Sequence, residues 1–261
     1  MPQGLWRGFR IMLAFLLLAL QGATDPAQAV VRLQQAIRAE PTRESNYTEL
    51  GNLLLSTRNF KEAAIVLEAA RARFPQSAQV HLSLGVAYYG QQGFSNAVAS
   101  FLDAAERDPD AEQPVLFLGR ITEHAGDRAA DVKAAFERFA KKHPQNPLGH
   151  FLYGKAAADP AALKRSIALN PNIWDSHFEL AALHEQSGDY ASAALAFEKA
   201  ARLSPKNPGP QYRLIRVYAR LNQPAKSQAA KARFETLSAQ EKAEADKRQA
   251  ATKHLDLKVR Q

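Results

Sequence analysis

The chain has 261 residues, 46% of them apolar, and its 34 basic and 26 acidic residues give a formal net charge of +8. This composition is typical of a folded protein and excludes a largely disordered chain. The sequence contains no cysteine, which excludes disulfides, thiolate metal sites, cysteine nucleophiles and a lipid carried on a cysteine. Frequent alanine, without alternating β-branched stretches, predicts helix almost throughout.

The first residues have the three parts of a secretory signal. Arg7 and Arg10 precede an apolar run at residues 11–20, and the small residues of 21–23 follow. Ten apolar residues are too few for a membrane span, which needs roughly twenty. We therefore expect residues 1–23 to be a signal peptide and the mature protein to be periplasmic or secreted, without a stable membrane span. An uncleaved N-terminal segment that anchors the protein is the alternative.

Two cleavage points compete, after Ala23 and after Ala29. Asp25 followed by Pro26 predicts a helix start, with the acid as cap and the proline in the first turn. Cleavage after Ala29 would remove that start, so we favour cleavage after Ala23.

The rest of the chain has an internal period of 34 residues, and a fixed period of this length indicates stacked structural repeats. Glycines and prolines recur at this spacing: Gly51, Gly85 and Gly119; Pro41, Pro75 and Pro109; Pro171 and Pro205. Residues twelve, eight and five positions before a proline also return in the same order: Ala63, Leu67 and Ala70; Ala97, Phe101 and Ala104; Ala193, Phe197 and Ala200. Each period thus predicts two helices, which approach closely at the glycine and end at the proline.

These residues resemble the tetratricopeptide repeat. Close instances are the runs Tyr47-Thr48-Glu49-Leu50-Gly51 and Leu84-Gly85-Val86-Ala87-Tyr88, and Gly93-Phe94 falls at the turn within a pair. The resemblance covers about residues 30 to 235. It implies an all-α fold, a right-handed α-α superhelix of antiparallel helix pairs, and a protein that holds other proteins.

The repeat register divides the chain after the signal into a half-repeat helix, five pairs, a cap and a tail. The expected segments are 24–43 (half-repeat), 44–77, 78–111, 112–146 (degenerate), 147–173 (shortened), 174–207, 208–240 (C-terminal pair or cap) and 241–261 (charged tail).

Three features depart from the standard repeat. One extra residue is expected in the turn near Gly126-Asp127. The unit from Gly154 to Pro171 is seven residues short, which removes about a turn from each helix, so we expect a kink there. In the last helix, packing is expected from four residues, followed by charge from Glu241 onward: Ala225, Ala229, Ala232 and Phe234.

No catalytic or metal-binding motif is present in the sequence, so we expect neither an enzyme nor a cofactor, and an unrecognised active site remains the alternative. His177 and His184 are seven residues apart, two helical turns, which is too far for one metal ion. His81, His150 and His177 occupy the large packing position of the repeat, where imidazole replaces an aromatic ring. We therefore interpret these histidines as packing residues.

The expected binding surface is the inner face formed by the first helices of successive pairs. Its middle is apolar and aromatic, and cations lie toward one end. The register places the following residues there: Asn52, Leu82, Val86, Tyr89, Leu116, Arg120, Phe151, Lys155, Phe178, Tyr212, Arg216 and Arg220, with His124 beside them.

Exposed aromatic residues beside arginine suit a peptide or an amphipathic helix. We therefore expect a scaffold that binds such a segment of an envelope protein. The alternative is a self-associating structural protein that uses its C-terminal tail, since residues 226–260 hold nine basic and five acidic residues. Nucleic acid is not an expected partner, because cations and acids are interspersed and export removes the protein from the cytoplasm.

Overall fold

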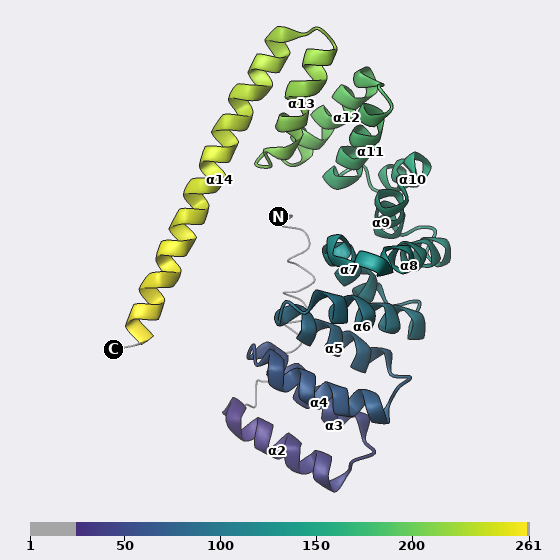
Figure 1. The fold of residues 1–261 in the computed structure, drawn as a ribbon, viewed down its shortest axis with the longest axis vertical. Coiled ribbons are helices and arrows are strands. Elements are labelled where there is room, and N and C mark those ends of the chain that lie inside the picture. The colour runs from purple at the N-terminus through teal and green to yellow at the C-terminus, as the bar shows by residue number, and fades with distance from the viewer. Residues whose placement is uncertain (1–24, 260–261) are drawn as a thin grey trace. The chain divides into compact units, whose positions relative to one another are not determined.

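The structure, a computed structural model, describes residues 25–259. Within them it contains thirteen α-helices, two short 3₁₀ helices and no strand, which confirms the all-α fold of paired helices (Figure 1). The expected signal peptide lies outside the described residues. None of the described helices is both long enough and apolar enough to cross a membrane. The chain divides into two compact units, residues 1–142 (unit 1) and 143–261 (unit 2).

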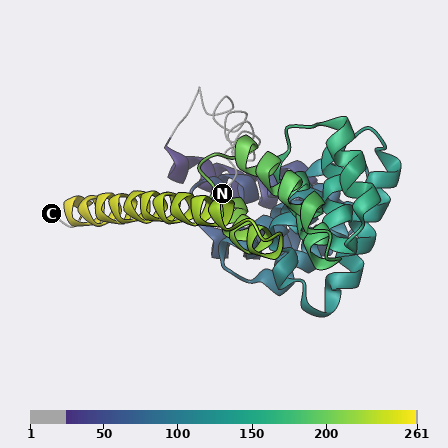
Figure 2. The same ribbon diagram turned by 90° about the horizontal axis from the view of Figure 1, so that it is seen from above.

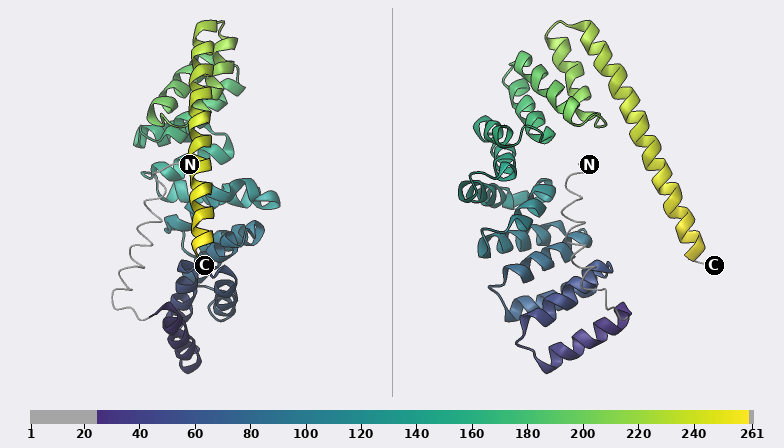
Figure 3. Two further views of the ribbon diagram at one scale, coloured as in Figure 1. Left: turned by 90° about the vertical axis from the view of Figure 1, so that its left-hand side faces the viewer. Right: turned by 180° about the vertical axis from the view of Figure 1, so that it is seen from behind.

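The described part of unit 1 consists of a single helix followed by three helix pairs that stack as layers (Figure 3). Its elements are α2 (Pro26–Ala39), α3 (Glu44–Ser56), α4 (Phe60–Arg73), α5 (Ala78–Gly90), α6 (Phe94–Arg107), α7 (Glu112–Ile121), η1 (Thr122–His124), η2 (Gly126–Arg128) and α8 (Ala129–Lys142). The α2 helix starts as expected, because the Asp25 carboxylate accepts a hydrogen bond from the backbone N–H of Ala27. Val30, Leu33 and Ile37 pack it against the first pair.

In the first two pairs, the helices meet where the sequence has its repeated small residue. A Cβ atom on Gly51 would lie 2.6 Å from the Leu67 side chain, and one on Gly85 would lie 2.5 Å from the Phe101 ring. Both Leu67 and Phe101 are completely buried. The absence of a side chain on the first helix therefore makes room for the large residue on the second.

The third pair of unit 1 holds the extra residue where it was expected. Residues 122–128 form two 3₁₀ turns between α7 and α8, and Gly126 has a φ of +53°, a left-handed conformation that glycine adopts without strain. Val132, Phe136 and Phe139 of α8 are buried in the register set by the repeat.

Unit 2 contains three further pairs, the last of which ends in a long helix. Its elements are α9 (Pro147–Ala157), α10 (Pro160–Leu169), α11 (Trp174–Gln186), α12 (Tyr190–Leu203), α13 (Gly209–Arg220) and α14 (Pro224–Val259). The shortening of the first pair is uneven: α9 has 11 residues against 13 in α11, and α10 has 10 against 14 in α12. The second helix therefore loses about a turn and the first about half a turn. The kink stays a prediction.

The packing residues expected in the last helix are partly wrong. Ala225, Ala229 and Ala232 are exposed, whereas Ala230 and Leu237 are buried, with Phe234 half-buried between them. The buried residues thus follow the spacing i, i+4, i+7 that places them on one side of the helix. Because alanine occurs at many positions of this helix, the alanines alone do not show which side is buried. Residues 239–250 are all exposed, and Figure 2 shows α14 as one straight helix.

A recurrent hydrogen bond follows four of the repeat prolines, those at positions 41, 75, 144 and 171. The side chain six residues after the proline contacts the proline carbonyl oxygen, at 3.2 Å from the Tyr47 hydroxyl and at 3.1, 3.1 and 3.0 Å from Nε2 of His81, His150 and His177. These histidines therefore replace an aromatic ring at a packing position, as interpreted from the sequence.

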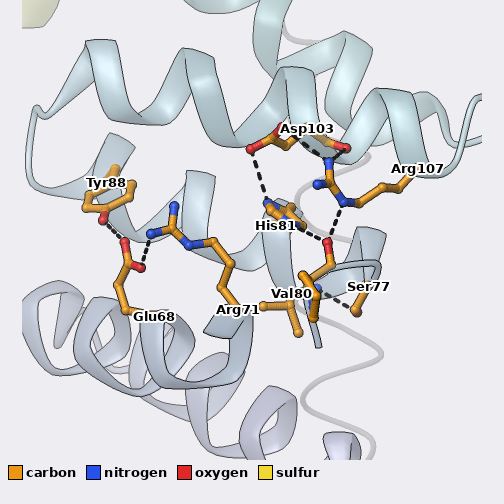
Figure 4. Close-up of polar contacts among 9 residues, drawn as sticks. Glu68, Arg71, Ser77, Val80, His81, Tyr88, Asp103 and Arg107 are labelled. Atoms are coloured by element: carbon orange, nitrogen blue, oxygen red, sulfur yellow. Dashed lines mark hydrogen bonds and ion pairs between the residues drawn. The ribbon is translucent and has the colours of Figure 1, made fainter. Parts of the chain in front are cut away.

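His81 also takes part in a polar cluster between α5 and α6 (Figure 4). Its Nδ1 atom lies 3.4 Å from the carboxylate of Asp103, which accepts a hydrogen bond from Arg107. Two turns further along α5, Tyr88 donates a hydrogen bond to Glu68 of α4. Burial, together with this bond, raises the pKa of Tyr88 to about 12, so its hydroxyl stays a donor at neutral pH.

The close helix approach predicts a strong effect of adding bulk at Gly85. Gly85→Val should lower the free energy of unfolding by about 1–3 kcal/mol, because the new side chain overlaps the buried Phe101 ring. Gly93→Ala is the control: its Cβ would lie no closer than 3.4 Å to a neighbouring atom, and its cost should stay below about 1 kcal/mol. Urea unfolding followed by circular dichroism measures both, and equal costs would contradict the interpretation of Gly85.

A second prediction concerns how the stability of the protein depends on pH. Burial lowers the pKa of His177, whereas a histidine in an unfolded chain titrates near 6.5. Protons therefore bind the unfolded chain first, so the stability contributed by neutral His177 is present above pH 6.5 and is lost as the pH falls. His177→Gln, which introduces the residue found at the equivalent position 211, should lose less unfolding free energy than the wild type between pH 7 and pH 5. Equal losses in urea titrations would refute this account.

Candidate functional site

Each unit presents its first helices as a surface of its own. The unit 1 face is formed by α3, α5 and α7, and α3 contacts α5 directly. Of the residues predicted there, Arg120 is exposed and Tyr89 is 36% exposed. The other predicted residues are half-buried: Asn52, Leu82, Val86 and Leu116. The unit 1 face is therefore largely apolar, and the most exposed of its predicted side chains are the Tyr89 ring and the Arg120 guanidinium.

A polar chain crosses this face between α3 and α5. The Gln79 side-chain amide donates to the Ser83 hydroxyl at 3.1 Å, and Ser83 donates to Oδ1 of Asn52 at 3.0 Å. Asn52 is thus committed to an interhelical bond through its oxygen, and its amide hydrogens remain for other acceptors.

A cluster of aromatic side chains lies at the C-terminal end of α5 on the unit 1 face. Tyr89 packs edge-on against Phe94 with ring centroids 6.0 Å apart, and Phe94 packs on His124 with centroids 3.9 Å apart. Sequence reasoning placed Phe94 only in a turn and did not assign it to the site. Its position at the start of α6, beside the last turn of α5, is the signal that could have identified it.

The unit 2 face is formed by α9, α11 and α13. Phe151 is half-buried, and the exposed Lys155 amine lies 3.3 Å from the Glu179 carboxylate. The Phe178 ring packs edge-on against the buried Phe197, with centroids 5.3 Å apart. Phe178 therefore contributes to the core as much as to the surface.

On α13, three of the predicted residues are exposed at four-residue spacing. Tyr212 is 60% exposed and its ring lies against Phe234 of α14, with centroids 5.4 Å apart. Arg216 and Arg220 follow one and two turns later, and both are exposed. The structure thus places an aromatic ring and two cations along one side of this helix.

A buried carboxylate fixes one of these cations. Glu185 of α11 is only 7% exposed; its oxygens lie 2.9 Å from Arg213 Nη2 and 2.6 Å from Arg216 Nε. The Arg213 guanidinium also lies 5.6 Å from the centre of the Phe197 ring. Sequence reasoning missed Glu185 and Arg213. These two residues are 28 positions apart, so the 34-residue period does not relate them to each other. Rings and fixed guanidinium groups on an open face are the anchors of peptide and helix partners.

The comparisons with known proteins identify the repeat. The family model of the tetratricopeptide repeat matches residues 48–112, 87–147 and 161–208, which together make up more than half of the chain. No curated protein sequence matches the chain.

Solved structures resemble the fold at low sequence identity. YrrB, described as a TPR protein with an unusual peptide-binding site, has a TM-score of 0.58 and 14% identity over 69% of this chain and 96% of its own. PilW, described as a widely conserved type IV pilus biogenesis factor, has a TM-score of 0.58 and 19% identity over 74% of this chain and 92% of its own. Pseudomonas aeruginosa PilF has a TM-score of 0.55 and 18% identity, with coverages of 74% and 91%.

At these identities the neighbours show the fold alone, whereas the family model matches the sequence itself in three stretches. The repeated glycine contacts and the bonds to the proline carbonyls give the physical basis of that match. This chain belongs to the tetratricopeptide repeat family.

Proposed function

We propose that this protein is an exported scaffold that binds a peptide or a helix of an envelope protein on its first-helix faces. The observation that carries the proposal is the exposure of Tyr89 on the unit 1 face and of Tyr212 on the unit 2 face. Each ring is supported by a second ring from a neighbouring helix, so it is held in place before a partner binds.

Supported aromatic side chains favour binding because little rotamer freedom is lost when a partner covers them. Each unit also carries an exposed arginine on a first helix, Arg120 in unit 1 and Arg216 in unit 2. A peptide-binding site in the YrrB structure and a role of PilW in pilus biogenesis agree with this class of function.

Export is supported by the N-terminal sequence, with its two arginines, its apolar run and its small residues before Thr24. An exported protein would meet the proteins of the cell envelope, and we propose that its partner is one of them.

A second candidate function is self-association through the C-terminal tail. The exposure of every residue from 239 to 250 on a continuous helix favours it, because a solvated helix of this length offers a long surface to a second copy. Light scattering on the full chain and on a chain ending at residue 240 tests this candidate, and an unchanged subunit number would exclude it.

The scaffold proposal predicts that the exposed tyrosines matter more than equally exposed apolar residues elsewhere. In cross-linking pull-downs from an envelope fraction, Tyr89→Ala with Tyr212→Ala should reduce recovery of an enriched partner at least tenfold, since buried aromatic anchors contribute about 2 kcal/mol or more. The matched control is Ile65→Ala with Leu195→Ala, two exposed apolar residues of the second helices α4 and α12, which should leave recovery unchanged.

If both double variants recover the partner equally, the first-helix faces are not the binding surface. Circular dichroism of each variant must show unchanged helix content for the comparison to count.

Cleavage of the signal has its own prediction. N-terminal sequencing of the exported protein should begin at Thr24, which keeps the Asp25 cap of α2 intact. A start at Val30 would show that the cap does not determine the cleavage point.

A further inference from the structure

The α13 helix has an unusual charge composition for a surface helix. Its twelve residues, Gly209–Arg220, include three arginines and no acidic residue. Tyr212, Arg216 and Arg220 form what we call the α13 stripe, with four-residue spacing on one side of the helix. Successive members are about 6 Å apart along the axis, at 1.5 Å per residue.

The charges around the α13 stripe do not balance. The single carboxylate of Glu185 faces two guanidinium groups, those of Arg213 and Arg216. The Glu185 side chain is 5% exposed, whereas that of Arg216 is 62% exposed. Among the described residues, no ion pair is formed by Arg220, which lies one turn further on. The surplus positive charge therefore faces solvent at Arg216 and Arg220.

Arg216 is held in position before any ligand arrives. Its Nε and Nη2 atoms lie 2.6 and 2.5 Å from Oε1 of the buried Glu185. These two contacts fix the guanidinium plane, while the side chain as a whole stays 62% exposed. Tyr212 is fixed similarly, against Phe234 of the adjacent α14, and Figure 1 shows α13 and α14 joined by a short turn. Groups that are already ordered bind a partner at a smaller cost in conformational entropy.

We infer that the α13 stripe recognises an acidic segment of the partner protein, in which an apolar side chain lies on Tyr212 and two carboxylates contact Arg216 and Arg220. This inference rests on the proposed scaffold function and names the chemistry of its ligand. Arginine binds carboxylates through paired N–H donors, with a geometry that lysine lacks.

The spacing of the stripe also defines a sequence pattern. An extended peptide rises about 3.3 Å per residue and turns alternate side chains to the same side. The 6 Å steps of the stripe therefore match every second residue of such a peptide. The preferred segment is an apolar residue followed by acidic residues two and four positions later.

A fluorescein-labelled probe peptide, Gly-Gly-Phe-Ala-Asp-Ala-Glu-Gly-Gly, tests the inference by fluorescence anisotropy with the full chain. The probe should bind, and binding should weaken as salt is raised. Arg220→Glu should weaken it at least tenfold. A probe with lysines in place of Asp and Glu should bind at least tenfold more weakly to the wild type.

Arg73→Glu is the matched control, because Arg73 is also an exposed arginine in the last turn of a helix, α4. Both substitutions lose the same favourable interaction with the helix dipole, so a difference between them reports on the ligand. Arg220→Gln removes the charge without reversing it and should weaken the probe several-fold, which guards against an effect of misfolding.

Three results would overturn the inference: no binding of the probe, equal weakening by Arg220→Glu and Arg73→Glu, or Arg220-dependent binding of phosphatidylglycerol vesicles in the absence of probe binding. The last result would assign the stripe to a membrane surface. The scaffold function is judged separately, since a partner that is lost with Tyr89→Ala and Tyr212→Ala but kept with Arg220→Glu would leave that function standing and refute the acidic ligand.

Discussion

Four of the described helix pairs are held together by the close approach of a small residue on the first helix to a large side chain on the second. Gly51 with Leu67, Gly85 with Phe101, and Gly154 with Leu163 leave no room for a Cβ atom. In the pair of α11 and α12, Ala181 and Phe197 are both completely buried. Because this contact fixes the distance between the two helices, it also decides which side of the first helix stays available to solvent.

The side that stays available is where the candidate binding residues lie. Bonds between neighbouring first helices, such as Ser83 to Asn52 in unit 1 and Arg216 to Glu185 in unit 2, use polar groups at the edges of these faces. They connect successive pairs without filling the surface with apolar side chains. The rings of Tyr89 and Tyr212 consequently remain exposed, which a fully packed interface would not permit.

The sequence was sufficient to predict the helix pairs because their determinants are local and repeated. A glycine, a proline and a buried large residue recur at fixed distances, and the Asp25-Pro26 helix start is a short-range signal. The α14 register was harder, since exposed Ala229 and buried Ala230 are adjacent identical residues. Only the longer pattern with Phe234 and Leu237 distinguishes them.

The site was predictable in outline and not in its contacts. The repeat register predicted the correct helix face for Arg216. Its bond to Glu185 could not be predicted, because the two residues are 31 positions apart and their contact depends on side-chain geometry between two helix pairs. Phe94 was missed for a similar reason, because its ring joins Tyr89 and His124 from a helix that register assigns to the other layer.

The position six residues after each proline shows how the repeats diverge. Within one chain this position is tyrosine, histidine, valine or glutamine, and the helices on either side are retained in each case. The first two bond the proline carbonyl, as at Tyr47 and His150, whereas the buried Val115 has no side-chain hydrogen donor. The repeats of this one chain thus form a natural substitution series at this position. In that series, either a hydrogen bond or apolar packing can hold the start of a helix against the turn that precedes it.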